Sequence, residues 1–287
     1  MSIYDVFSGG SKPFNKEEWA AQKQAERKEA YELIDNTCTE MMGNGDSFRQ
    51  YLDVQGRFDR YSVANAILVS AQMPEATQLK DYSKWKQSHV YVNKDAQKIT
   101  ILEPSKEYTR EDGSKAVSYN TKTVYDISET SASGRVEQPE PKAMRELVSA
   151  LIDASPVGFQ PVDDLEMASY YDSSQQTIFI RTGLTDEQLF VSMAKEVSAA
   201  VYDFKYNESR DASDFKSFCT AYMVSTRYGV DTKGFSFDKL PKEYEQMDTQ
   251  AFKAELGSMR DVLGEIQSEM YKNLEKNKPA KSKEQGR

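Results

Sequence analysis

Apolar positions recur at spacings of three and four along much of the chain, which predicts helices because that spacing aligns side chains on one face. The clearest stretch is 182–205. Its apolar positions are Leu189, Met193, Val197, Ala200, Val201 and Phe204. Thr185 and Gln188 form a capping-box pattern at its start. Asp186 and Glu187 add negative charge to the first turn, which favours a helix N-terminus there.

The same periodicity predicts further helices, and alternation with period two predicts strands. The helices are expected at 16–42, 47–52, 61–73, 142–154, 212–228 and 249–274. A β-hairpin is expected over 85–102, with its turn near 93–97. Strands are expected at 119–127 and 177–181, and a charged turn at Asp112-Gly113. The predicted fold class is therefore α+β.

The stretch SASGRVEQPEP (131–141) combines Ser, Gly, Pro and Glu without a large apolar cluster, which is typical of a linker. It divides the chain into a predicted first domain, 16–130, and a mainly helical second domain, 142–272. Residues 1–15 are expected to be a flexible tail. Residues 273–287 are expected to be a basic, disordered tail.

The composition is that of a water-soluble chain, with 38% hydrophobic and 29% charged residues among 287. No apolar run is long enough to span a membrane, and the first ten residues lack the pattern of a secretory signal. Cys38 and Cys219 form no disulfide framework and indicate reduced thiols. These features predict a cytoplasmic protein.

Charge is distributed unevenly along the chain. Residues 1–135 have 18 bases and 20 acids, whereas residues 136–271 have 13 bases and 24 acids. Residues 77–110 have 7 bases against 4 acids and also contain several aromatic residues. Interleaved cations and rings suit single-stranded nucleic acid, because cations follow phosphates while rings stack on unpaired bases. The alternative interpretation is a solvated sheet face with ordinary core aromatics.

Eight residues of this basic segment are the candidates for contact with nucleic acid. They are Lys80, Lys84, Lys86, Lys94 and Lys98 for phosphates, and Tyr82, Trp85 and Tyr91 for bases. The acidic second half would repel a phosphate backbone, so binding is expected in the first half.

Helix 182–205 also raises the question of a zinc peptidase. Such a helix carries two histidines at i and i+4 with a glutamate between them. Here the five positions read KEVSA, from Lys195 through Glu196 to Ala199, and His89 is the only histidine in the chain. We therefore expect no metal, no cofactor and no catalysis at this helix. Glu196 is expected to be a structural remnant, paired with Lys195 or another base.

Several longer stretches of the first half carry a family resemblance. They are FRQYL (48–52), RFDRYSVANAILVSAQMPEATQLKDYSKW (57–85), KITILEP (98–104) and TVYDISET (123–130). Together they resemble the N-terminal single-stranded-DNA-binding domain of ArdC-type antirestriction proteins and of LtrC-like proteins of conjugative elements. The relatives have a Gly- and Lys-rich turn where this chain has Asn93 to Lys98, which keeps two lysines but adds an acid.

The second half resembles the zincin-like metallopeptidase domain of the same proteins, through residues 170–188 and 220–237. In that family the helix carries HExxH, which Lys195 and Ala199 interrupt here. The downstream acidic ligand of the family would fall near Phe218, which cannot bind a metal. The resemblance therefore implies a zincin-like domain without its metal ligands.

Two functions follow as hypotheses. The first is a non-catalytic single-stranded-DNA-binding protein of a mobile or conjugative element, with an antirestriction-related role. The alternative is a protein-interaction module, in which the acidic second half binds a protein partner. No membrane partner is expected.

Overall fold

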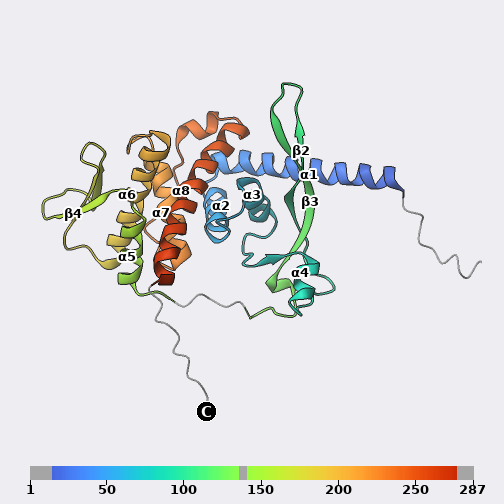
Figure 1. Ribbon diagram of the computed structural model, residues 1–287, viewed down its shortest axis with the longest axis horizontal. Coiled ribbons are helices and arrows are strands. Elements are labelled where there is room, and N and C mark those ends of the chain that lie inside the picture. Colours follow the sequence, from blue (N-terminus) through green and yellow to red (C-terminus); the bar gives the residue numbers. More distant parts are fainter. Residues whose placement is uncertain (1–14, 136–140, 277–287) are drawn as a thin grey trace, which may run out of the picture.

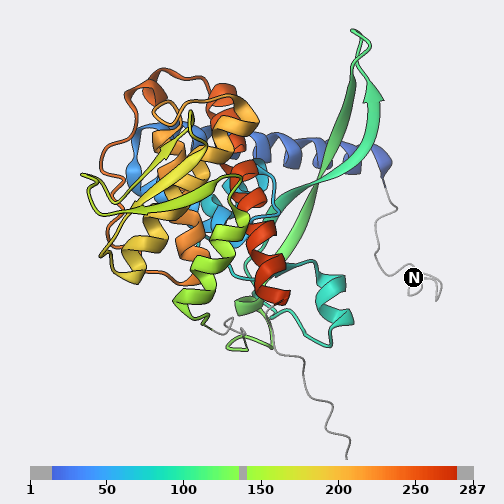
Figure 2. The same ribbon diagram turned by 60° about the vertical axis from the view of Figure 1, so that its left-hand side comes forward.

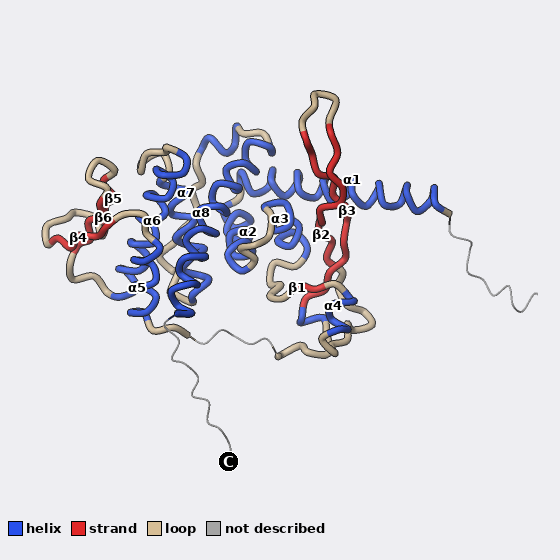
Figure 3. Tube along the Cα trace, in the orientation of Figure 1, coloured by secondary structure: helices blue, strands red, loops and turns tan. Residues whose placement is uncertain are grey.

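The computed structural model describes residues 15–135 and 141–276, and within them it has eight α-helices and two small sheets (Figures 1 and 3). The predicted α+β class is confirmed. The helices are α1 (Lys16–Gly43), α2 (Gly45–Arg57), α3 (Val63–Gln72), α4 (Tyr82–Gln87), α5 (Met144–Ala154), α6 (Asp186–Tyr206), α7 (Asp214–Tyr228) and α8 (Thr249–Lys276). The strands are β1 (Leu79–Lys80), β2 (Ile99–Thr109), β3 (Lys115–Asp126), β4 (Gly158–Val162), β5 (Ser169–Asp172) and β6 (Thr177–Arg181).

Helix α6 begins as its sequence predicts. The backbone N–H of Gln188 donates to Thr185 Oγ1 at 3.3 Å, and the N–H of Thr185 donates to Gln188 Oε1 at 3.1 Å. The helix ends at Asn207, which adopts the left-handed conformation that Asn tolerates. Phe204 is a correction to the predicted apolar face, because it is 55% exposed near the end of the helix.

The predicted hairpin at 85–102 is wrong in its pairing. Residues 82–87 form α4 instead, and Val92 makes only an isolated bridge to Thr130. Strand β2 pairs antiparallel with β3, and the hairpin turn lies at Asp112-Gly113, where Gly113 has a φ of 81°. Strand β3, with 12 residues, is long enough to pair along β2, which has 11, whereas residues 82–87 are capped as a helix by Asp81.

The far end of the hairpin of β2 and β3 projects beyond the packed helices, as Figure 2 shows. Its ladder has a register shift between Pro104 and Glu107, and a bulge of this kind bends the strand. Beyond that point the side chains of β2 are exposed. Helix α1 crosses the hairpin in both views, and its residues contact β3 and β2.

At the base of the hairpin, β1, α4, the loop to Lys98 and residues 124–135 form what we call the α4 lobe. Trp85, Ile127 and Ala132 form its small core, which is separate from the main core. Asp126 closes the lobe, because its carboxylate accepts the backbone N–H groups of Thr77 at 2.7 Å and Gln78 at 2.8 Å.

In the second half, β6 lies between β4, which is parallel to it, and β5, which is antiparallel. The strand predicted at 177–181 is confirmed as β6, whereas β4 and β5 were not predicted. Helix α6 packs against β5 and β6 of this sheet, and α5, α7 and α8 pack in turn against α6 (Figure 1).

One buried cluster contains side chains from both sides of the predicted linker. Phe48 of α2 lies 5.9 Å from Phe215 of α7 and 6.2 Å from Phe252 of α8, measured between ring centroids. At the edge of this contact, Tyr222 Oη donates to Asp53 Oδ1 at 2.6 Å. The start of α2 is therefore packed against elements of the second half.

The predicted division into 16–130 and 142–272 stays a prediction. Residues 136–140 of the linker lie outside the described residues, as do 1–14 and 277–287 of the predicted tails. Within the described ranges, no helix is long and apolar enough to cross a membrane. Cys38 and Cys219 are both buried and free, as the sequence predicts.

The contact at the start of α2 leads to a prediction about Gly45. A Cβ at this position would collide with the backbone carbonyl of Phe237, which a side-chain rotation cannot relieve. Gly45→Ala is therefore expected to lower the free energy of unfolding by about 2 kcal/mol, as overpacking does. The measurement is urea denaturation followed by circular dichroism.

Gly43→Ala is the matched control, because nothing lies within 4 Å of a Cβ at Gly43. Alanine at this helical position is expected to be neutral or to stabilise by about 0.5 kcal/mol. Equal unfolding midpoints for the two variants would contradict the close packing of α2 against Phe237.

Candidate nucleic-acid interface and the buried Glu196 site

Asp81, the N-cap residue of α4, already interacts with neighbouring groups of the protein. The carboxylate of Asp81 accepts the backbone N–H of Lys84 at 2.8 Å and lies 3.2 Å from Lys122 Nζ. The Lys84 N–H, and then Lys122, lower the pKa of Asp81. This carboxylate is therefore ionised at neutral pH and compensated by its own neighbours.

The predicted lysines of the α4 lobe are accessible. Lys84, Lys86, Lys94 and Lys98 are exposed, and Lys80 is half-buried. None of the four exposed lysines forms an ion pair with a residue in the ranges that the structure describes. Their ammonium groups are therefore free to meet an external anion.

Two of the predicted stacking residues are also accessible. Tyr82 is 56% exposed on α4, and Tyr91 is 62% exposed on the loop that follows. The backbone of Tyr91 is held in place, because its N–H donates to Ser131 Oγ at 3.0 Å and its carbonyl accepts the N–H of Ser131 at 2.8 Å. A ring on a fixed backbone loses less freedom when a base stacks on it.

Trp85 is a correction to the predicted stacking set. Its side chain is 2% exposed, and its indole N–H donates to the carbonyl of Tyr125 at 2.9 Å. Lys80 Nζ lies 4.5 Å from the centroid of the ring. Trp85 thus belongs to the core of the α4 lobe, and no face of its ring is open to a base.

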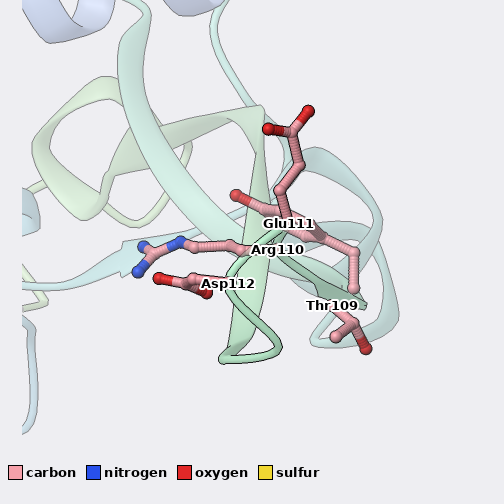
Figure 4. A pocket seen from close by; sticks show the side chains of 5 residues that line it. Thr109, Arg110, Glu111 and Asp112 are labelled. Atoms are coloured by element: carbon pink, nitrogen blue, oxygen red, sulfur yellow. The ribbon is translucent and has the colours of Figure 1, made fainter.

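The tip of the hairpin has a shallow hollow of mixed charge (Figure 4). Arg110 and Asp112 extend to the same side, whereas Glu111 points away from them. Two acids against one base make this tip a poor site for phosphate groups.

A different arrangement surrounds Glu196 in the second half. Glu196 is 2% exposed, and both of its oxygens are hydrogen-bonded to Arg210. Arg210 Nη2 donates to Oε1 at 2.7 Å, and Arg210 Nε donates to Oε2 at 2.8 Å. The backbone N–H of Tyr171 in β5 also donates to Oε2, at 2.9 Å. The hydrogen bonds that Arg210 donates to Glu196 raise the pKa of Arg210, so the guanidinium stays charged.

The other three predicted degenerate positions carry no metal ligand. Lys195 forms an ion pair with Asp214 at 2.7 Å. Ala199 is buried at 2% exposure. Phe218 packs its ring 4.9 Å from that of Phe235.

These residues do not fit the metal that the family resemblance implies. A metal at Glu196 would have to displace Arg210, whose guanidinium donates to both carboxylate oxygens. Among residues 15–135 and 141–276, no group of three or more His, Cys, Asp or Glu side chains could hold a metal ion. The base that pairs with Glu196 is Arg210, which lies beyond the end of α6 and was not singled out from the sequence.

No protein-family model matches the sequence, and a comparison with curated protein sequences finds no significant match. The chain is similar in structure to the antirestriction protein ArdC from plasmid R388. For the Mn(II)-bound crystal structure of ArdC the TM-score is 0.49 at 14% identity, over 75% of this chain and 85% of that one. For the metal-free structure it is 0.45 at 15% identity, over 75% and 86%. Because one fold hosts many functions, the function of this chain has to be inferred from its own residues.

The Glu196–Arg210 pair leads to a prediction about stability. Arg210→Ala would leave a buried carboxylate without its partner, which is expected to lower the free energy of unfolding by about 3 kcal/mol. The double variant E196Q/R210A removes the charge as well and is expected to recover part of that loss. Urea denaturation of both variants measures the difference.

Lys195→Ala is the control for this experiment. Its ion pair with Asp214 is partly exposed, so its loss is expected to cost less than about 1 kcal/mol. If Arg210→Ala were as mild as Lys195→Ala, the buried pair would not stabilise the fold as argued.

Proposed function

We propose that this protein binds single-stranded DNA through the α4 lobe and that it does so without catalysis. The observation that carries the proposal is the set of four exposed, unpaired lysines that share this lobe with two exposed tyrosines. Lys84, Lys86, Lys94 and Lys98 neutralise phosphates, and Tyr82 and Tyr91 stack on bases. Lys80 is assigned a structural part in the lobe, because its ammonium group lies over the ring of Trp85.

Single strands suit this surface better than duplex DNA. A ring can stack on a base only where the face of that base is not covered by its neighbours, as in an unpaired strand. The lobe also has no long helix for a major groove, since α4 has only 6 residues. Stacking of this kind tolerates different bases, so binding has little sequence preference.

The second half supports the non-catalytic part of the proposal. A zinc peptidase needs an open metal position and a glutamate that is free to act as a base. Here both oxygens of Glu196 accept hydrogen bonds from Arg210. We therefore regard this half as a degenerate zincin-like domain.

The biological context rests on the sequence resemblance to ArdC-type and LtrC-like proteins. It favours a protein of a mobile or conjugative element, with an antirestriction-related role in the cytoplasm. The protein partner expected for the acidic second half stays a prediction.

The binding proposal is tested with the full chain and a fluorescent oligo(dT) in an anisotropy titration at about 50 mM salt. Because exposed lysines supply the phosphate contacts, the affinity is expected to fall steeply as salt is raised. Replacing Lys84, Lys86, Lys94 and Lys98 together by Ala is expected to reduce the salt slope by about 0.7 for each lysine that contacts a phosphate.

The matched control replaces four exposed lysines of the second half by Ala. They are Lys233, Lys239, Lys242 and Lys272. Both variants lose the same charge, so equal weakening would show a general electrostatic effect and would refute the α4 lobe as the site. No anisotropy change with the unmodified protein would refute DNA binding itself.

The non-catalytic proposal is tested with metal. Since the guanidinium of Arg210 occupies both oxygens of Glu196, millimolar Mn(II) or Zn(II) is expected to leave the melting temperature unchanged, whereas a bound ligand raises it. Metal analysis of the purified protein provides the second readout. The proposal would be refuted if the protein contained one equivalent of either metal per chain and lost it when Glu196 is replaced by Gln.

A further inference from the structure

A groove lies between the N-terminal half of α1 and the projecting part of the hairpin. Its volume is about 560 Å³, and it is broadly open to solvent. The α1 side provides Arg27, Lys28 and Tyr31, and the hairpin side provides Tyr108 of β2 and Tyr119 of β3. The groove is therefore built from two elements far apart in the sequence.

The lining of this groove has a distinct chemistry. Tyr31, Tyr108 and Tyr119 are 45%, 50% and 40% exposed, so three rings are open to solvent around one hollow. Arg27 and Lys28 provide two positive charges, and no acidic residue lines the groove. Lys28 has one ion pair, with Glu32 at 3.4 Å, in which both side chains are more than half exposed. Such a pair is weak and yields easily to a stronger anion.

One acid of α1, Glu26, is occupied in holding the helix against the hairpin. The carboxylate of Glu26 accepts the hydroxyl of Thr121 in β3 at 2.9 Å and pairs with Lys23 Nζ at 2.6 Å. Lys23, and then Thr121, lower the pKa of Glu26, which keeps it ionised. Glu26 thus links α1 to the hairpin instead of repelling an anion from the groove.

Helix α1 itself points to a binding role at this end. Its buried residues begin at Ala30. The preceding turns are exposed or half-buried and mostly polar, and their one large apolar side chain, Trp19, is 50% exposed. Turns that bury so little gain little from packing and need another reason to extend. In both views the early turns of α1 continue past the hairpin (Figures 1 and 2).

We propose that this groove between α1 and the hairpin is a second contact site for single-stranded nucleic acid, in which Tyr31, Tyr108 and Tyr119 stack on bases while Arg27 and Lys28 neutralise phosphates. The inference rests on the proposed DNA binding and extends it from the α4 lobe to the far part of the hairpin. Cations beside open rings are the combination that unpaired strands require. An acidic peptide would use the cations but would gain little from three open rings.

The sheet connects the two sites. Tyr119 and Tyr125 lie on the same strand, and Tyr125 pairs with Lys80 at the α4 lobe. Six residues of strand span about 20 Å. One strand of nucleic acid that follows β3 can therefore contact both sites only if it is long enough to cover that distance.

The test uses the full chain and fluorescent oligo(dT) of about 6 and about 24 nucleotides, which bracket the usual site sizes of single-strand binders. The variant Y108A/Y119A is expected to bind the long oligonucleotide about tenfold or more weakly, because each lost base–ring stack weakens binding by that order. Y108F/Y119F keeps both rings and is expected to bind as the unmodified protein does. Y271A is the control for loss of an exposed tyrosine elsewhere, since Tyr271 is 61% exposed on α8.

The length of the oligonucleotide separates the two sites. Loss of the groove is expected to reduce the advantage of the long oligonucleotide over the short one, because only the long one covers both sites. R27A/K28A is expected to lower the salt slope with the long oligonucleotide. Poly-glutamate is the competitor for an acidic peptide: displacement of oligo(dT) at equal charge concentration would overturn the assignment to nucleic acid.

Failure of this inference and failure of the proposed function are distinguishable. If Y108A/Y119A binds the long oligonucleotide as tightly as Y271A does, while the α4-lobe lysine variant is weakened, the groove is refuted and the proposed function stands. If the groove variants weaken binding and the α4-lobe variant does not, the groove is supported and the α4 lobe is refuted. No binding by the unmodified protein refutes both.

Discussion

A buried carboxylate needs a partner, and this requirement organises the second half of the protein. Glu196 lies on a helix that is enclosed on nearly all sides, where an uncompensated charge would be very costly. Arg210 provides two hydrogen bonds, and the backbone of Tyr171 provides a third. The pair thereby ties α6 to strand β5 and to the segment that leads into α7.

The same pair decides what the site can do. A metal would be attracted by a free carboxylate, but here a guanidinium already meets both oxygens and a second cation, Lys195, is engaged nearby with Asp214. The guanidinium of Arg210 thus occupies the carboxylate oxygens that a metal ion would need as ligands. The fold is thus held together by an internal ion pair at this position of α6.

The first half presents the opposite situation, because its charges face solvent. Two acids next to the proposed surfaces are engaged with internal partners: Asp81 of the α4 lobe with Lys122, and Glu26 of α1 with Lys23 and Thr121. Among the described residues, the exposed lysines of the lobe, Lys84, Lys86, Lys94 and Lys98, have no ion-pair partner. A segment with a small net charge can therefore present a positive surface. An approaching anion interacts mainly with the exposed charges that have no internal partner, and not with the net charge of the whole segment.

The sequence by itself determined the helices other than α4, and the absence of a histidine pair. Periodicity and caps such as Thr185 with Gln188 act over a few residues, so α6 could be placed before its surroundings were known. Only the tertiary structure decided which strand β2 pairs with, that Trp85 is buried, and that Arg210 neutralises Glu196. Each of these depends on contacts between residues that are far apart in the sequence. Short-range patterns do not show which of several possible distant partners a segment will contact.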